Sequence, residues 1–505
     1  MERRLRIVSR PVLSCQEAGE FEANFFRGDE TLEWRAMQQA GRSLANAIAA
    51  DSGEIGGWGG RPRFLILVGK GHNGGDALIA ADLLLAQNPG AHADVVFLFG
   101  ERSLRPLTRR AWISFQRNGF NRSAIVHSTE RLAPGYDLVV DGVFGFQFRP
   151  PLSEGVALWL ERINALDVRL RAAVDLPSGL GETKAFRADF SYATGITKTP
   201  LLTIPNAGRI RHLDLGWDVP SGSGTATRVL MEETLAPLTR LRDSRTDKRS
   251  YGHLGVVGGS LQYPGAVLMT VRAALQGGCG LLTAFVPDSL VASFAAAVPE
   301  AMWVGWPETP EGGLAMEGAH VLRRRLERLT ALVVGPGLGR EVETLACIAS
   351  EMRTFRFPVL IDADALQPNI VTAGDCAKIL TPHAGEFARI GEGLDLESYV
   401  RRHQSVVVLK GPITRVASGE IQYCSPFGGP VLARGGSGDL LSGIIGSLLA
   451  QNPESPLEAA ATGVVWQGCA ADVLARAHGA TAVTATQILG CLSGAIRRSP
   501  ASGYL

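Results

Sequence analysis

Short apolar runs alternate with longer helical patterns along most of the chain. Before residue 215, four apolar or β-branched runs occur at residues 63–69, 93–100, 136–145 and 170–179. Runs of this length, bounded by turn residues and separated by helical spacing, are typical of buried strands in a parallel sheet with crossover helices. The earlier segment 31–50 has helical spacing, and we expect it to pack on this sheet.

A second alternation of the same kind fills much of the remaining chain. Six further runs occur at residues 253–260, 280–287, 331–339, 358–366, 377–383 and 405–411, and long alanine-rich helical patterns follow them. The two halves share no obvious repeat period. The pattern therefore predicts an α/β protein with two three-layer units, each a sheet between layers of helices.

A polar, glycine-rich segment separates the two halves. Residues 217–228 read WDVPSGSGTATR, and the stretch from there to about Asp247 shows no clear strand. A chain of 505 residues is too long for one ordinary core, so we expect two large domains. The boundary is predicted near residue 225, which gives domains at 1–224 and 225–505.

Composition narrows the classes of function. Lys and Arg number 50 against 49 Asp and Glu, so no basic field is available to attract nucleic acid or an anionic membrane surface. No apolar run reaches the ~18 residues of a membrane helix, and no signal-peptide core follows the N-terminus, so we expect a cytoplasmic protein. Seven scattered cysteines without a C-x-x-C pair indicate neither a disulfide framework nor a zinc site.

A glycine-rich turn and two aspartates indicate a ligand site in the N-terminal half. The segment LVGKGHNGGDALIAADLLL places four glycines between an expected strand and a helix, and Asp141 and Asp175 stand at the carboxyl ends of two expected strands. One such aspartate is commonly a helix cap. Two beside a glycine-rich turn favour a site, because open parallel sheets bind ligands outside those strand ends.

The motifs NGGDAL, DGVFG and VDLPSGL, in this order and spacing, resemble the YjeF N-terminal domain, a Rossmann-like three-layer αβα domain that epimerises NAD(P)H hydrates. The resemblance implies that Asp175 is the catalytic acid or base. It also implies a potassium ion held through oxygen ligands by Asn73, Asp141 and Ser178. Substrate contacts are implied for residues 72 to 76 and 145 to 151, which include His72, Asn73, Gly74, Gly75, Asp76, Gly145, Phe146 and Gln147.

This domain departs from the family pattern in several places. His72 replaces the usual first Asn of the turn, Lys70 stands where a small residue or Pro is common, and Ala77 replaces a glycine. Phe146 and Gln147 replace a Thr-Gly pair and are bulkier. These changes leave open a second interpretation, in which the N-terminal domain is a catalytically silent nucleotide-binding or scaffolding module.

A second glycine-rich turn lies near the C-terminus. The segment LARGGSGDLLSGIIGSLLA, residues 432–450, places Gly435, Gly436, Gly438 and Asp439 directly before an apolar helical pattern. A helix start needs only one capping residue, which Ser437 or Asp439 alone could supply. Glycines admit a group close to the backbone, and a helix N-terminus attracts anions, so the stretch indicates an anion site rather than only a tight turn.

Five segments at the ends of expected strands, VVGPGLG, LIDADAL, LTPHAGEF, LKGPITRVASG and GGSGD, occur in series. They resemble the YjeF C-terminal domain, a ribokinase-like three-layer αβα domain that dehydrates NAD(P)H hydrates with ADP or ATP. The resemblance implies that Asp439 is the base on the hydrate's hydroxyl. Phosphate contacts are implied for Gly435, Gly436, Ser437 and Gly438, nucleotide contacts for Lys410, Gly411, Pro412, Ile413 and Thr414, and hydrate contacts for Ala266, Gly337 and His383.

Other residues of these segments carry weaker implications. Asp362 and Asp364 are expected to be helix caps without a catalytic role, and His383 alone would as often be a capping or structural residue. Glu386 is a candidate for the outer shell of a magnesium ion. The sequence DKR replaces a usual H-K-G at the entry to the domain, and GGPV replaces a usual G-N-P-G. Neither change touches Asp439, so we expect dehydratase activity.

The two resemblances together imply repair of hydrated NADH and NADPH. The chain would interconvert R and S epimers and dehydrate the S epimer by phosphorylation of its hydroxyl and elimination. Mg²⁺ and K⁺ are the implied cofactors, ADP or ATP is the co-substrate, and a homo-oligomer is expected. The motifs do not indicate whether the hydrate of NADH (NADHX) or that of NADPH (NADPHX) is the preferred substrate, or whether ADP or ATP is the phosphate donor. The alternative is a ribokinase-like vitamin kinase beside a silent N-terminal nucleotide-binding domain.

Overall fold

The computed structural model describes residues 4–219 and 226–497, which form two compact units. The N-terminal unit contains residues 10–219 and 475–480, and the C-terminal unit contains residues 4–9, 226–474 and 481–497. Residues 4–9 are thus grouped with the C-terminal unit, unlike in the predicted ranges. The predicted boundary falls at residues 220–225, which lie outside the described residues.

A parallel sheet forms the centre of the N-terminal unit. Its strands follow the order β4-β3-β2-β5-β6-β7-β9, and every neighbouring pair is parallel. The four strands expected from the apolar runs are confirmed as β2, β3, β5 and β6. The strands of the unit are β1 Ser9–Leu13, β2 Arg63–Val68, β3 His92–Phe97, β4 Ser123–Ile125, β5 Gly135–Gly142, β6 Asp167–Val174, β7 Phe190–Thr194, β8 Thr197–Lys198 and β9 Arg209–Leu213.

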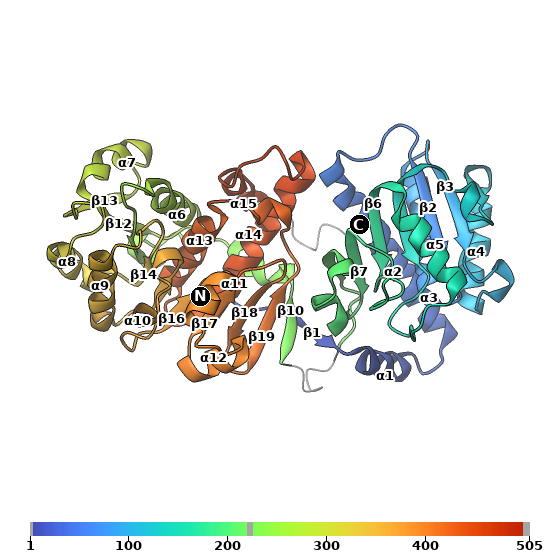
Figure 1. The fold of residues 1–505 in the computed structure, drawn as a ribbon, viewed down its shortest axis with the longest axis horizontal. Helices are drawn as coiled ribbons and strands as arrows, with labels where there is room; N and C mark the ends of the chain where they lie inside the picture. The colour runs from blue at the N-terminus through green and yellow to red at the C-terminus, as the bar shows by residue number, and fades with distance from the viewer. Residues whose placement is uncertain (1–3, 220–225, 498–505) are drawn as a thin grey trace. The chain divides into compact units, whose positions relative to one another are not determined.

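Helices cover both faces of this sheet (Figure 1, blue to green). Phe64, Ile66 and Val68 of β2 pack with apolar side chains of α2, α3 and α4, whereas Leu65 and Leu67 pack with α5. Successive strand residues point to opposite faces, so both sides of β2 are buried and the unit has three layers. The helices are α1 Cys15–Phe26, α2 Glu30–Asp51, α3 His72–Gln87, α4 Pro106–Gly119 and α5 Glu154–Asn164.

The C-terminal unit is built on a mixed sheet. Its strands follow the order β13-β12-β11-β14-β15-β16-β17-β18-β19-β10, with β18 antiparallel to both β17 and β19. The six expected strands are confirmed as β11, β12, β14, β15, β16 and β17. The strands are β10 Thr227–Leu230, β11 His253–Val257, β12 Leu281–Pro287, β13 Met302–Trp306, β14 Ala331–Val334, β15 Val359–Ile361, β16 Lys378–Leu380, β17 Val406–Leu409, β18 Thr414–Ser418 and β19 Ile421–Ser425.

Strand β10 lies in the stretch where the sequence showed no clear strand, so that expectation is wrong. Only four residues long, β10 pairs in parallel with β19, with Thr227 opposite Gln422 and Val229 opposite Cys424. Its hydrogen-bonding partner lies far away in the sequence. A strand this short is stabilised by its pairing with β19, and its own apolar pattern is too weak to predict it.

Helices also pack on both faces of the second sheet (Figure 1, green to red). Leu332 and Val334 of β14 belong to a core shared with α9, α11 and α12, whereas Val333 lies against Gly446 of α13. The predicted α/β class with two three-layer units is therefore confirmed. The helices are α6 Pro264–Gln276, α7 Val291–Ala297, α8 Ala319–Arg323, α9 Val342–Glu351, α10 Pro368–Val371, α11 Ala384–Ile390, α12 Leu396–His403, α13 Ser437–Gln451, α14 Pro456–His478 and α15 Gln487–Arg497.

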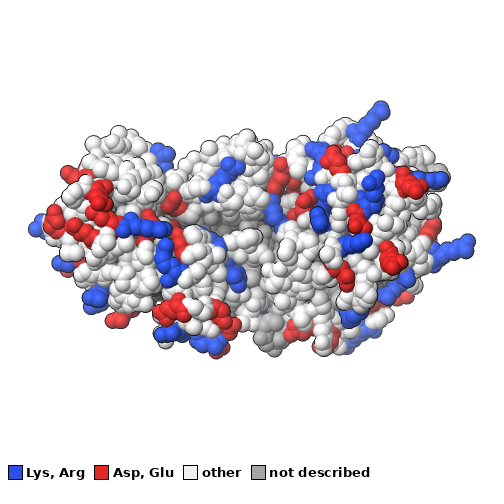
Figure 2. Space-filling model, in the orientation of Figure 1, with Lys and Arg blue, Asp and Glu red and all other residues white. Residues whose placement is uncertain are grey.

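The surface carries both signs of charge in close mixture. On the face shown in Figure 2, Lys and Arg side chains are interspersed with Asp and Glu, in keeping with the near balance of the whole sequence. In the part of the chain that the structure describes, no helix combines the length and apolarity needed to cross a membrane.

Helix α13 is held against α6 by small residues. A Cβ on Gly443 would lie 2.3 Å from the Thr270 carbonyl oxygen and 2.7 Å from Ala273 Cβ. The Thr270 hydroxyl also donates to the Asp439 carbonyl oxygen at 3.1 Å. The glycine thus sets how closely α13 approaches α6, and with it the position of the helix start that carries Asp439.

We predict that Gly443→Ala destabilises the C-terminal unit although alanine is the better helix former. The gain in helix propensity is about 1 kcal/mol, whereas a Cβ forced against the α6 backbone costs about 1–3 kcal/mol or more. Gly490→Ala is the matched control, because Gly490 lies within α15 and a Cβ there meets nothing within 4 Å. Calorimetric unfolding of the whole chain should show a lower transition for the first variant and an unchanged or higher one for the second. A stabilised Gly443→Ala would contradict the close approach.

Candidate active sites

The N-terminal site lies at the carboxyl edge of the first sheet. Strands β2, β5 and β6 are neighbours, so the turns that follow them meet at one edge. A cavity of about 470 Å³ opens there. It brings together predicted residues from all three turns, namely His72, Asn73, Asp76, Gly145, Phe146, Gln147 and Asp175.

Glycine is required where these turns cross. A Cβ on Gly69, directly after β2, would lie 1.9 Å from the Val143 carbonyl oxygen. A Cβ on Gly142, at the end of β5, would lie 2.6 Å from both the Asn73 carbonyl oxygen and Ala77 Cβ. The start of α3 therefore rests directly on the turn after β5, and Ala77, one of the departures from the family pattern, fits this packing.

The three residues implied as potassium ligands form one hydrogen-bonded network. The Ser178 hydroxyl and amide both donate to the Asp141 carboxylate at 2.7 Å, and the Phe144 amide donates to the Ser178 hydroxyl. The Asn73 side-chain amide donates to the carbonyl oxygens of Phe144 and Val174. Burial raises the pKa of Asp141 to about 6 against the lowering effect of the Ser178 hydrogen bonds.

This network fits a potassium ion by the chemistry of its donors. Because the Asn73 nitrogen is used for donation, its amide oxygen is the atom left to accept or coordinate. Asp141 and Ser178 add a carboxylate and a hydroxyl, so the set consists of hard oxygen ligands.

Asp175 is buried and paired with a lysine that the sequence analysis missed. Its Oδ1 accepts from Lys198 Nζ at 2.5 Å, and Lys198 is fully buried at the end of β8. Its Oδ2 is buried without a hydrogen-bond partner, and the backbone holds Asp175 at φ 66°. Asp175 is therefore not a helix cap. A strained aspartate with one oxygen unused, at the wall of a cavity, is the arrangement expected of a functional group.

Several residues that depart from the family pattern, among them Lys70, His72 and Phe146, line this cavity. Lys70 Nζ lies 4.6 Å from the centre of the Phe99 ring, and His72 Nε2 lies 3.5 Å from the Glu33 carboxylate. Burial lowers the pKa of His72, with Glu33 acting in the opposite direction. The Phe146 ring lies 5.2 Å from Lys198 Nζ, a cation–π distance, so the bulkier side chain packs over the ion pair.

The C-terminal site is built at the start of α13. The N-cap is Gly436 at φ 90°, a conformation that favours glycine, and no side chain caps the helix. Ser437 turns its hydroxyl back to the carbonyl oxygens of Leu432 and Arg434. Neither Ser437 nor Asp439 therefore acts as the cap that each could have supplied. The Ser437 amide donates to the Arg434 carbonyl oxygen at 3.3 Å, and the amides that follow it in the first turn are suited to bind an anion.

The buried Asp362 pairs with the partly exposed Lys410 beside this helix start. Asp362 Oδ1 accepts from Lys410 Nζ at 3.1 Å and from the Thr381 hydroxyl at 2.7 Å, and its Oδ2 accepts from the Ser442 hydroxyl at 2.7 Å. A Cβ on Gly438 would lie 3.2 Å from Lys410 Nζ. The lysine therefore presents its charge at the glycine-rich turn.

The expectation that Asp362 and Asp364 are helix caps is wrong. Asp362 stands at an N-cap position but makes no capping hydrogen bond, because Thr381, Lys410 and Ser442 use its oxygens. Asp364 instead accepts the Gly339 amide at 3.1 Å and so fixes the turn after β14. Both carboxylates tie neighbouring turns together across the strand ends.

Asp439 lies in the first turn of α13 among several charges. Burial, followed by the negative charge of Asp362, raises the pKa of Asp439 to about 7, while Lys410 lowers it. Burial opposes the charged form of Lys410, but the carboxylates of Asp362 and Glu386 raise the pKa of its ammonium overall. The turn thus combines a weakly acidic carboxyl group with a stable cation.

His383 is the capping residue that the sequence left as an alternative. Its Nδ1 accepts the amides of Gly385 and Glu386 at the start of α11, and the Glu386 carboxylate accepts the His383 amide. Glu386 thus uses its Oε2 in the helix cap, and its place in the outer shell of a magnesium ion stays a prediction. Within the described residues, no group of three or more His, Cys, Asp or Glu side chains is placed to hold a metal ion.

The remaining predicted residues lie on turns at the same sheet edge, except Ala266, which lies in the first turn of α6, and Thr414, which begins β18. Gly337 follows β14 at φ 64°, and a Cβ on it would lie 3.0 Å from Ala266 Cβ, so this predicted pair is in contact. Residues 410–413 form the turn between β17 and β18. Lys410 is linked to the turn after β16, since its amide donates to the Pro382 carbonyl oxygen.

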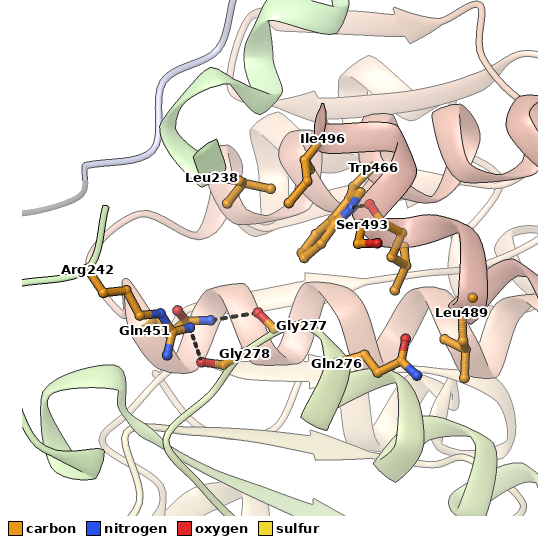
Figure 3. Close-up of a pocket in the computed structure, with 12 residues that line it drawn as sticks. Leu238, Arg242, Gln276, Gly277, Gly278, Gln451, Trp466, Leu489, Ser493 and Ile496 are labelled. Carbon is orange, nitrogen blue, oxygen red and sulfur yellow. Dashed lines mark hydrogen bonds between the residues drawn. The ribbon is translucent and has the colours of Figure 1, made fainter. Parts of the chain in front are cut away.

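A separate cavity of about 470 Å³ in the C-terminal unit contains none of the predicted residues (Figure 3). Gln451, in its wall, ends α13 about 18 Å along the helix axis from Asp439. Arg242, Gln451 and Trp466 donate to the carbonyl oxygens of Gly278, Gly277 and Leu492 respectively. These donors already serve the backbone, and we assign this cavity no ligand.

Two sequence families match the two halves of the chain. The family YjeF_N, YjeF-related protein N-terminus, matches residues 34–199. The family Carb_kinase, NAD(P)H-hydrate dehydratase, matches residues 254–493. The matches cover the strand-end turns of both sites.

Whole-length relatives combine both halves. The chain is 36% identical over 514 residues to the bifunctional NAD(P)H-hydrate repair enzyme Nnr of Gloeobacter violaceus, covering 95% of this chain and 97% of that protein. It is 32% identical to the enzyme of the same name from Moorella thermoacetica, covering 86% and 87%. A solved ADP/ATP-dependent NAD(P)H-hydrate dehydratase from Bacillus subtilis, co-crystallised with ATP/Mg²⁺, is 27% identical and covers 53% of this chain and 97% of its own, with a TM-score of 0.46. The chain belongs to the family of bifunctional NAD(P)H-hydrate repair enzymes.

Proposed function

We propose that the two units divide the two steps of NAD(P)H-hydrate repair between them. The N-terminal unit interconverts the R and S epimers, and the C-terminal unit dehydrates the S epimer to NADH or NADPH at the expense of ADP or ATP. We expect this work to take place in the cytoplasm and in a homo-oligomer. The observation that carries the proposal is the position of Asp439, in the first turn of α13 beside Lys410.

In the dehydratase step Asp439 is the base. Its carboxylate takes the proton from the hydrate's hydroxyl while the oxygen attacks the terminal phosphorus of the nucleotide, and the bond from phosphorus to the bridging oxygen breaks. A base with a pKa near the working pH suits this transfer. The carbon–oxygen bond of the new ester then breaks, phosphate leaves with its electron pair, a proton is lost from the adjacent ring carbon, and the ring double bond returns.

The phosphates are held by backbone and by Lys410. The amides of residues 435–438 lie at the N-terminus of α13, where the helix dipole favours an anion. Lys410 Nζ approaches Gly438 from the other side of the turn. Together they stabilise the charge that grows on the transferred phosphoryl group. Gly411 to Thr414 continue along the β17–β18 turn to the start of β18 as the contact for the rest of the nucleotide.

Magnesium enters with the nucleotide in this proposal. Mg²⁺ commonly keeps several waters and binds through substrate phosphates with only one or two carboxylates. We propose Asp364 and Asp439 as the carboxylates that bind the ion, because neither caps a helix. Glu386, whose Oε2 caps α11, remains the candidate for the outer shell. The ion would neutralise phosphate charge during transfer.

In the epimerase step Asp175 is the acid or base that acts on the hydrate. Its unpartnered Oδ2 is the atom free to exchange a proton, while Lys198 keeps Oδ1 paired. Asn73, Asp141 and Ser178 would hold K⁺, which supplies a fixed positive charge for the dinucleotide's phosphates. His72, Asn73, Asp76 and Gly145 to Gln147 supply the wall against which the substrate lies, and the buried Gly74 and Gly75 lie behind it in α3.

Asp439→Asn should abolish recovery of NADH from S-NADHX while leaving epimer interconversion intact. Loss of a general base costs about 10²- to 10⁴-fold in rate. Near-ultraviolet absorbance of the reduced nicotinamide measures recovery in the presence of Mg²⁺ and ADP, and then ATP. Chromatographic separation of the epimers measures interconversion without nucleotide. A persistent phosphorylated product of the wild type would instead identify a kinase that does not carry out elimination.

The dehydratase rate should rise with pH through the pKa of Asp439, about 7, because only the carboxylate accepts the proton. The charges that face Asp439 are Asp362, Lys410, Asp364 and Glu386. Asp362→Asn removes a negative neighbour, so the carboxylate forms more easily and the midpoint of the profile should move to lower pH. Glu397→Gln, in an exposed pair with Arg401, is the control that leaves the midpoint in place. A midpoint unmoved by Asp362→Asn would contradict this electrostatic account.

Asp175→Asn should stop epimer interconversion and also weaken the N-terminal unit. The variant leaves Lys198 buried without a counter-charge, which costs about 3–5 kcal/mol. Asp175→Asn/Lys198→Met removes both charges, so most of the stability should return while interconversion stays absent. Thermal unfolding and chromatography of the epimers separate the two effects. If the wild type interconverts epimers no faster than buffer does, the N-terminal unit is a silent nucleotide-binding module.

A further inference from the structure

Glu22 is a carboxyl group of the N-terminal cavity that the proposed mechanism does not use. It lies on α1, outside every motif considered in the sequence, and lines the same cavity as Asp76 and Asp175. Lys198, Asp175 and Glu33 are close enough to affect its ionisation. The charged side chains that line the cavity are four carboxyl groups, Glu22, Glu33, Asp76 and Asp175, and three cations, Lys70, Arg105 and Arg149, while the buried Lys198 pairs with Asp175.

The carboxyl groups of this cavity differ in how they are paired. Lys198 donates to Asp175 at 2.5 Å. Asp76 is buried, and among the described residues its Oδ1 has no hydrogen-bond partner. Burial, followed by the charges of Asp175 and Glu22, raises the pKa of Asp76 well above its ordinary value, and burial raises the pKa of Glu22 to about 7, against the lowering effect of Lys198. Glu22 and Asp76 therefore keep a proton to higher pH than an exposed carboxyl group does.

Epimerisation of a hydrate at this site needs both a protonated carboxyl group and an ionised one. The hydroxyl of the hydrate is on the ring carbon bonded to the ring nitrogen. Inversion by loss and return of water requires an acid to protonate the leaving hydroxyl and a base to deprotonate the entering water. Pairs of titratable groups whose surroundings separate their pKa values are the usual source of such acid and base roles.

We propose that Glu22 is the second catalytic residue of the epimerase, the proton donor that acts with Asp175 as proton acceptor. The inference rests on the proposed epimerase function of the N-terminal unit. Glu22 is only partly buried, so it can recover its proton from solvent after each turnover, which the buried Asp76 cannot do as readily.

The step balances in protons and electrons. Glu22 gives its proton to the hydroxyl oxygen, the carbon–oxygen bond breaks, and the nitrogen lone pair forms a carbon–nitrogen double bond as water leaves. Water then adds to the opposite face of the flat ring, its proton passes to Asp175, and the electron pair returns to nitrogen. In the reverse direction the two residues exchange roles. The anionic side chains stabilise the transient positive ring.

Other charged groups that face Glu22 also affect how the rate of epimer interconversion depends on pH. They come from every element around the cavity: Lys198 on β8, Asp175 after β6, Glu33 on α2, Asp76 and His72 on α3, and Lys70, Arg105 and Arg149 on the surrounding turns and helices. The test must therefore separate Glu22 from His72 and Asp76. Variants of all three serve that purpose.

The experiment measures the R/S ratio of an R-enriched NADHX preparation over time, with the full chain, K⁺ and no nucleotide, after subtraction of the buffer rate at each pH. The wild type should lose rate as the pH rises through about 7, where Glu22 gives up its proton. Glu22→Gln should slow interconversion by about 100-fold or more and remove this alkaline decline. Glu22→Asp keeps the carboxyl group and should keep the decline. Glu20→Gln, exposed on the same helix, should match the wild type.

The outcomes separate this inference from the function it rests on. A wild type no faster than buffer means that the epimerase proposal itself fails, and added Mg²⁺ and ADP then show whether the C-terminal unit still recovers NADH. A wild type that interconverts epimers together with an unaffected Glu22→Gln overturns the role of Glu22. So does an alkaline decline that survives Glu22→Gln and disappears in Asp76→Asn or His72→Gln.

Discussion

An ion pair between a lysine and a buried aspartate at the strand ends underlies each site. Lys198 meets Asp175 in the N-terminal unit, and Lys410 meets Asp362 in the C-terminal unit. A buried charge left without its partner costs several kcal/mol, which holds for Lys198, Asp175 and Asp362, whereas Lys410 is 23% exposed and keeps contact with water. The members of each pair come from segments that are distant in the sequence. Each site is therefore in place only when these segments have folded together.

These pairs have a consequence for the carboxyl groups around them. Burial is the largest cause of the raised pKa values of these carboxyl groups; the aspartate of the pair raises them further, and the lysine of the pair lowers them. Asp439 and Glu22 both reach a pKa of about 7 in this way, in units with unrelated sheets. In both units a carboxyl group proposed to transfer a proton thus lies beside the ion pair and is not a member of it. Carboxyl groups with strongly shifted pKa values commonly mark functional sites.

The sequence predicted what depends on local pattern. Apolar runs located the central parallel strands of both sheets, and glycines followed by aspartates located turns at their carboxyl ends. It could not predict Lys198, because one lysine in the segment TKTP has no periodicity or motif, and its partner is known only when β8 and β6 are placed. Asp362 was mistaken for a cap for the same reason. Its position after a strand suggested a local role, whereas Thr381, Lys410 and Ser442 all reach it from other elements.

The cap made by His383 also determines which kind of group the ring can meet. Since Nδ1 accepts two backbone amides, the neutral ring must carry its hydrogen on Nε2. Nε2 is then a donor and cannot accept. The side chain is exposed, and its Nε2 lies 3.5 Å from Glu386 Oε1. A carbonyl or phosphate oxygen of a ligand can therefore accept a hydrogen bond from Nε2, whereas an amide N–H group cannot donate to it. Because His383 caps helix α11 through Nδ1, the cap fixes Nε2 of its ring as a hydrogen-bond donor toward a ligand.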